Sequence, residues 1–190
     1  PYIKFDKNPL VAYQDTTKWG VGQSTTIVKD SATIQLFYHS TTENGPFCMR
    51  EIKLNDLDNI VLGEEQAIPF LSANSYPAMS DKYIYMVSET RVSPIKEIPT
   101  WVGDVCRLAY KPRTEDLAGD KDGWIEIGHA GPEETGFPRN HNPGILTDTK
   151  GYMLSDDELV MYFTPAMTGE NWLWSYDLYS ATFNLKSYFK

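Results

Sequence analysis

The sequence predicts an all-β fold built from β-propeller blades. Three times along the chain, a long strand rich in apolar and aromatic residues is followed by a second strand, and a shorter strand candidate precedes each pair. The three pairs cover residues 33–40 and 47–54, 83–89 and 102–110, and 159–164 and 173–183. A repeat several tens of residues long that contains only strands is typical of propeller blades. Helical periodicity is nearly absent, because only residues 54–59 offer a single turn.

Each repeat predicts one antiparallel sheet of about four strands. The shorter first strands are the expected inner strands of the blades, at residues 23–29, 75–79 and 142–147. Outer strands are expected at residues 59–68 and 124–128, whereas the third repeat has no evident fourth strand. We therefore expect a single propeller segment over residues 1–190, with blades at 19–69, 72–131 and 139–190 and with residues 1–18 completing a blade.

Three blades do not close a ring, because propellers have at least four. An open arc would expose apolar blade faces and unpaired strand edges, which natural proteins avoid. We therefore expect the missing blades to come from the same protein or from a second chain.

The composition argues against two classes of partner. The net charge is −9, whereas nucleic acids and anionic membranes bind basic patches, so neither is expected as a partner. No apolar run approaches the length of a membrane-spanning helix. The 12 Tyr and 5 Trp residues fit either the core of a β-sheet protein or a sugar-binding surface, and both interpretations stay open at this point.

The two cysteines occupy matching places, because Cys48 and Cys106 each lie in the second long strand of a repeat. Sheets of neighbouring blades pack about 10 Å apart. A disulfide needs a shorter approach of the two backbones. The sequence therefore predicts two buried thiols.

The strongest local signal for a site lies in residues 134–144, just before the third inner strand. Here Arg139, His141 and Asn142 stand between proline and glycine residues. Arg fixes the geometry of the groups it binds, and His and Asn can each donate and accept hydrogen bonds. This mixture predicts binding of a polyhydroxylated ligand, with Gln23 at the matching place in the first repeat. The alternative is a structural turn whose side chains satisfy loop backbone groups.

Glu89 is the candidate catalytic residue, as a carboxyl group for proton transfer. It ends the long apolar strand of the second repeat, where partial burial would raise its pKa. Arg91, two residues on, is a candidate substrate-binding residue that could instead lower this pKa. A surface salt bridge at the end of the strand is the alternative interpretation.

The aromatic candidates for sugar stacking are Trp19 and Trp172, which lie in predicted loops next to repeats. Tryptophans in such loops serve either as stacking platforms or as lids packed on the core. The three His and two Cys residues show no metal-ligand spacing. We therefore expect no metal and no cofactor.

Two segments carry a resemblance to a known group of enzymes. Gly20-Val-Gly-Gln-Ser-Thr-Thr-Ile-Val, followed by Ile34-Gln-Leu-Phe-Tyr, resembles a blade start in five-bladed propeller glycosidases of the arabinanase and β-xylosidase type. Residues 135–148, with Trp174-Ser-Tyr downstream, are similar to closing blades of relatives of those enzymes. The resemblance covers nearly the whole chain at the level of the blade pattern. It implies the C-terminal portion of a five-bladed, glycosidase-like propeller.

The resemblance further implies a secreted glycoside hydrolase, extracellular or periplasmic, that acts on a poly- or oligosaccharide. Such an enzyme carries three inward carboxylates: a base or nucleophile Asp, a pKa-tuning Asp and a general-acid Glu. Here Gln23 and Asn142 stand where an Asp is common, and Glu89 matches the acid by position alone. A glycan-binding propeller without catalysis, or a structural or assembly subunit, are therefore the alternatives.

Overall fold

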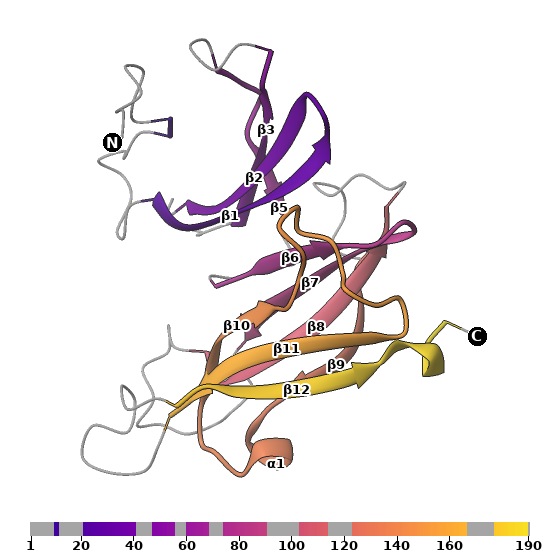
Figure 1. The fold of residues 1–190 in the computed structure, drawn as a ribbon. Coiled ribbons are helices and arrows are strands. Elements are labelled where there is room, and N and C mark those ends of the chain that lie inside the picture. The colour runs from indigo at the N-terminus through magenta and orange to yellow at the C-terminus, as the bar shows by residue number, and fades with distance from the viewer. Residues whose placement is uncertain are drawn as a thin grey trace.

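The computed structural model describes residues 10–11, 21–40, 47–55, 60–68, 74–90, 103–113, 123–166 and 177–189. These residues form three antiparallel sheets and almost no helix, which confirms the all-β prediction (Figure 1). Each sheet begins with its innermost strand, and the first strand of the second sheet contacts those of the other two. This is the arrangement of consecutive propeller blades.

The first sheet is built on a long hairpin. Its strands are β1 (Val21–Asp30), β2 (Thr33–Ser40), β3 (Phe47–Lys53), β4 (Val61–Leu62) and β5 (Gln66–Ile68). The side chain of Asp30 closes the β1–β2 turn by accepting a hydrogen bond of 2.8 Å from the backbone N–H of Ala32. Both β4 and β5 pair with β3. The predicted outer strand at 59–68 is therefore two short strands.

The second sheet lies between the other two. It contains β6 (Tyr76–Met79), β7 (Tyr83–Thr90), β8 (Val105–Pro112) and β9 (Ile125–Ala130), paired in chain order. The four-residue helix α1 (Pro132–Thr135) follows β9 and was not predicted. Glu134 supports its start, because its carboxylate accepts a hydrogen bond of 3.0 Å from the N–H of Gly131.

The third sheet contains β10 (Asn140–Ile145), β11 (Glu158–Pro165) and β12 (Tyr179–Asn184). A short 3-10 helix, η4 (Leu185–Ser187), follows. In the part of the chain that the structure describes, this sheet has three strands. No helix among the described residues has the length and apolar character that crossing a membrane requires.

The core fills the two spaces between neighbouring sheets, and β7 contributes to both. Ile84 and Met86 pack toward the first sheet, whereas Tyr85 and Val87 pack toward the third. Successive side chains of a strand point to opposite faces, so a strand buried on both faces reads as one continuous apolar run. The thiols of Cys48 and Cys106 are also buried and form no disulfide, as predicted.

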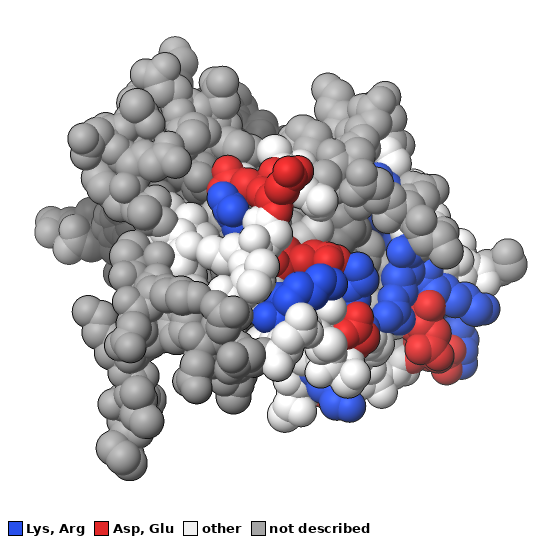
Figure 2. Space-filling view, turned by 90° about the horizontal axis from the view of Figure 1, so that it is seen from above, with Lys and Arg blue, Asp and Glu red and all other residues white. Residues whose placement is uncertain are grey.

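The surface carries charges of both signs. On the face seen from above, acidic and basic side chains lie side by side (Figure 2). In the first sheet, Nζ of Lys53 lies 3.3 Å from Oε2 of Glu51 on the same strand, and Lys29 of β1 pairs with the same carboxylate. Exposed pairs of this kind contribute little to stability.

The connection between β10 and β11, residues 146–157, ties all three sheets together, and we call it the strap. Its Lys150 carbonyl accepts a hydrogen bond of 3.0 Å from Val28 of β1, and its Gly151 carbonyl accepts one of 2.9 Å from Met79 of β6. Met153 donates back to the carbonyl of Met79 at 2.8 Å. The strap therefore lies across the ends of β1 and β6 that are remote from where these strands start.

Replacing Gly151 with alanine should lower the free energy of unfolding by about 2 kcal/mol. Gly151 has a φ of 86°, and an added Cβ would lie 3.2 Å from the carbonyl oxygen of Thr26. Gly136→Ala is the matched control, since Gly136 has a φ of 74° with nothing within 4 Å of the added Cβ. Chemical denaturation should show the smaller loss for Gly136→Ala. Equal losses of unfolding free energy in the two variants would show that the close contact between the strap and Thr26 does not contribute to stability.

Candidate functional site

Three residues with left-handed backbone mark the starts of the inner strands. Gln23, Asn74 and Asn142 have φ values of 51°, 55° and 48°, and they are the non-glycine residues with positive φ in the described part of the chain. Gln23 and Asn142 lie where the pairing of β1 and β10 shifts register. Such backbone is uncommon for a residue with a Cβ, although Asn tolerates it better than most. Its recurrence marks an equivalent turn at the start of each inner strand.

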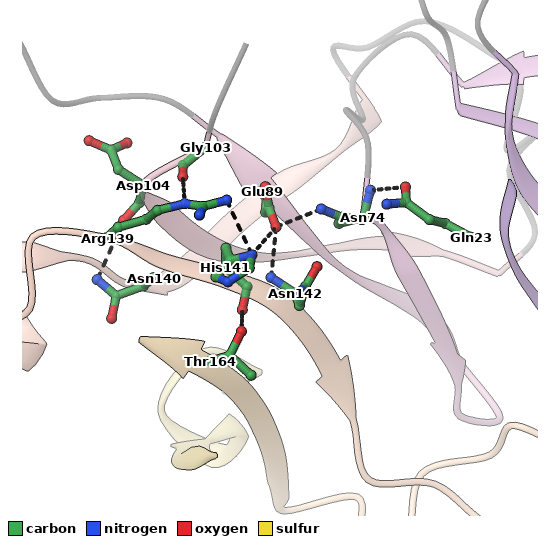
Figure 3. A network of polar contacts seen from close by, with 10 residues as sticks. All are labelled: Gln23, Asn74, Glu89, Gly103, Asp104, Arg139, Asn140, His141, Asn142 and Thr164. Atoms are coloured by element: carbon green, nitrogen blue, oxygen red, sulfur yellow. Dashed lines mark hydrogen bonds and ion pairs between the residues drawn. The ribbon is translucent and has the colours of Figure 1, made fainter. Parts of the chain in front are cut away.

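Glu89, near the end of β7, joins two of these strand starts (Figure 3). Its Oε1 accepts hydrogen bonds of 2.7 Å from Nδ2 of Asn74 and of 2.7 Å from the backbone N–H of Asn142. The backbone N–H of Asn74 in turn donates to Oε1 of Gln23 at 3.1 Å. One hydrogen-bonded chain therefore runs from the first sheet to the third through the buried carboxylate.

On the other side of Glu89 lie two buried basic side chains. Nδ1 of His141 is 3.6 Å from Oε1 of Glu89, which is longer than a hydrogen bond. Nη2 of Arg139 is 3.3 Å from the same Nδ1. The hydroxyl of Thr164 on β11 donates to the carbonyl of His141 at 3.0 Å and fixes the backbone there. The imidazole thus lies between a guanidinium and a carboxylate.

The segment before β8 supports this arrangement. The carbonyl of Gly103 accepts a hydrogen bond of 3.2 Å from Nε of Arg139, and the carbonyl of Asp104 accepts one of 3.0 Å from the N–H of Asn140. Gly103 also faces Glu89 directly, because a Cβ added there would lie 2.8 Å from its Oε2. The absence of a side chain at position 103 is therefore needed for the carboxylate to occupy its place.

The site has two layers that differ in exposure. Gln23 and Asn142 are exposed and Asn74 is half-buried, whereas the Glu89 and His141 side chains are 8% and 4% exposed. Amide side chains both donate and accept hydrogen bonds. The outer layer can therefore bind neutral hydroxyl groups, and the inner layer holds the outer one in position. No group of three or more His, Cys, Asp or Glu in the described part of the chain is placed to hold a metal ion.

The structure brings five of the predicted site residues into one network: Gln23, Glu89, Arg139, His141 and Asn142. The other three lie outside the described residues: Trp19, Arg91 and Trp172. The interpretation of Glu89 as part of a surface salt bridge is wrong, because its side chain is buried. Asn74 and Gly103 were not among the predicted site residues. The repeat itself held the signal for Asn74, which stands before β6 as Gln23 and Asn142 stand at the starts of their strands.

Three antiparallel sheets with adjacent inner strands and a polar site at the starts of those strands define a set of β-propeller blades. No protein-family model matches the chain, and no curated protein matches it significantly.

Solved structures do resemble the chain. It is similar to the α-L-arabinofuranosidase PaAbf62A from Podospora anserina in complex with cellotriose, with a TM-score of 0.53 and 16% identity over 87% of this chain and 54% of that one. A second structure is a glycoside hydrolase family 43 arabinoxylan arabinofuranohydrolase from Bacillus subtilis in complex with cellotetraose, with a TM-score of 0.45, 15% identity and coverage of 87% and 35%. The chain thus spans about half the length of the first structure. At this identity the likeness concerns the fold.

Proposed function

We propose that this chain is part of a carbohydrate-active β-propeller that hydrolyses glycosidic bonds in a poly- or oligosaccharide. The observation that carries the proposal is the row of amide side chains of Gln23, Asn74 and Asn142 at the inner-strand starts of three blades, connected by hydrogen bonds to the buried carboxylate of Glu89. Neutral hydroxyl-binding groups around a carboxyl group suit a sugar substrate. The likeness of the fold to an arabinofuranosidase supports this class of substrate.

In this proposal Glu89 transfers the proton, and Arg139 and His141 hold its carboxyl group in place. The amides of Gln23, Asn74 and Asn142 bind sugar hydroxyls. Arg91 contributes to substrate binding, and Trp19 and Trp172 stack on sugar rings.

Hydrolysis requires a second carboxyl group across the scissile bond. We propose that it is supplied by the remaining blades of a five-bladed ring, contributed by the same protein or by a second chain. The complete protein would act outside the cell or in the periplasm, where polysaccharides are met.

A propeller that binds a glycan without cleaving it is the second candidate. Both hydrogen bonds described for Oε1 of Glu89 hold backbone or amide groups of the site, and the side chain is 8% exposed. In this candidate the carboxylate fixes the side-chain amide of Asn74 and the backbone N–H of Asn142. The amides that replace the expected Asp residues cannot act as acids or bases, which also favours this candidate.

Replacing Glu89 with glutamine should separate the two candidates. The amide oxygen of glutamine can still accept from Asn74 and Asn142, so the site should keep its shape and bind oligosaccharides with unchanged affinity. Loss of proton transfer should lower the hydrolysis rate about 100- to 10,000-fold. On the complete protein with all its blades, reducing-sugar release from arabinoxylan measures the rate, and calorimetry with cellotetraose measures binding.

Glu126→Gln is the matched control, because Glu126 lies on β9 with a side chain that is 45% exposed. Its rate and affinity should equal those of the wild type. Binding by the wild type without any hydrolysis would favour the non-catalytic candidate. Full turnover by the Glu89→Gln variant would show that Glu89 does not transfer the proton.

A further inference from the structure

An exposed aromatic ring lies on the third sheet close to the site. Along β11, Leu159, Met161 and Phe163 point into the core, and Tyr162 points to the opposite face. Tyr162 is 41% exposed among the described residues, and the next blade of the proposed ring would cover part of this face. Exposed aromatic residues are common, but the ring of this one covers a glycine and lies on the strand next to Asn142.

The ring of Tyr162 lies across the inner strand of its sheet. Tyr162 pairs with Gly144 of β10. A Cβ added at Gly144 would lie 2.3 Å from Cζ of the ring and 2.5 Å from its hydroxyl oxygen. The ring therefore reaches over the backbone of β10, which is possible only because position 144 has no side chain. Its tip is carried toward the inner edge of the sheet, where the site lies.

One neighbour connects this ring to the polar network. Asn142, with its exposed amide, stands two residues before Gly144 on the same strand. The ring that covers Gly144 therefore places an aromatic surface on the inner strand that carries this amide.

We propose that Tyr162, seated on Gly144, is an aromatic platform on which one ring of the bound saccharide stacks, next to the hydroxyl-binding amide of Asn142. The inference rests on the proposed function and adds a binding subsite to it. The apolar C–H face of a sugar would lie on the phenol ring, while its hydroxyls reach the amides. An uncharged saccharide fits this surface, because the outer layer consists of amides and a phenol.

The competing explanation is structural, since an aromatic ring can simply cover a glycine on a neighbouring strand. The two explanations differ in what Tyr162→Ala and Tyr162→Phe do to binding. For a platform, calorimetric titration with cellotetraose and arabinoxylan oligosaccharides should show affinity about 10-fold lower for Tyr162→Ala, while Tyr162→Phe keeps it within about threefold. Gly144→Ala should weaken binding like Tyr162→Ala, because the added methyl group displaces the ring.

The control is Tyr188→Ala, which removes a tyrosine that is 49% exposed and lies in the C-terminal segment after η4. Its affinity should equal that of the wild type. Melting temperatures of all variants, measured on the complete protein, show that each is folded. Unchanged affinity of Tyr162→Ala, with or without a lower melting temperature, would overturn the platform and leave the proposed function standing. A wild type that binds none of the saccharides would overturn both.

Discussion

Replacing Glu89 with alanine should lower the free energy of unfolding by about 3 kcal/mol. The carboxylate accepts hydrogen bonds from the side chain of Asn74 and from the backbone of Asn142, and it lies beside His141. Asn74 precedes β6, whereas His141 and Asn142 are neighbours on β10, and the side chain that joins the two strand starts is 8% exposed. Without it, two partly buried donors lose their acceptor.

Urea denaturation of the Glu89→Ala and Glu89→Gln variants measures this effect. Glutamine should restore most of the stability, because its amide oxygen can accept both hydrogen bonds. Glu126→Ala, on an exposed side chain of β9, should change stability by less than about 0.5 kcal/mol. A Glu89→Ala variant as stable as this control would show that the network contributes nothing to the fold.

Replacing Gly103 with alanine should disable the site even though it adds only a methyl group. The new Cβ would lie 2.8 Å from both Cβ and Oε2 of Glu89 and 3.3 Å from the carbonyl oxygen of Thr90. Glu89 cannot move away freely, because Asn74 and Asn142 hold its other oxygen. We expect about 1–3 kcal/mol of destabilisation from overpacking. Binding or turnover should fall on the order of 100-fold, as for other displacements of about 1 Å in a site.

Gly22→Ala is the matched control for this substitution. Gly22 lies on β1 next to Gln23, and nothing is within 4 Å of the Cβ that alanine would add. Stability and saccharide affinity should stay near the wild-type values in titrations run side by side. Wild-type affinity in the Gly103→Ala variant would mean that the position of the Glu89 carboxylate does not matter for the ligand.

The central strands of the fold could be predicted because their side-chain pattern is a local property. The strand predicted at 33–40 is β2, and the one predicted at 83–89 is β7 with one further residue. Apolar and aromatic runs between turn residues favour such strands from the local sequence alone. The outer strands were predicted less accurately, as β4 and β5 show. Short edge strands depend on their partner strand more than on their own residues.

The site residues could be predicted where a position in the repeat or the local composition marked them. Counting from the strand starts placed Gln23 and Asn142 at matching positions, and the loop composition pointed to Arg139 and His141. The burial of Glu89, the contribution of Asn74 and the need for glycine at position 103 depend on contacts between residues far apart in sequence. The hydrogen bond between Asn142 and Glu89, for example, joins positions 53 residues apart.

The sequence by itself determined the all-β character, the three repeats and the polar residues at the start of each inner strand, because alternation and turn chemistry act over a few residues. Tertiary structure alone decided that these residues form one connected network around a buried carboxylate, and that the strap holds the opposite end. The physical reason is that burial and hydrogen-bond partners depend on how the three sheets pack, and packing brings together side chains that no local pattern relates.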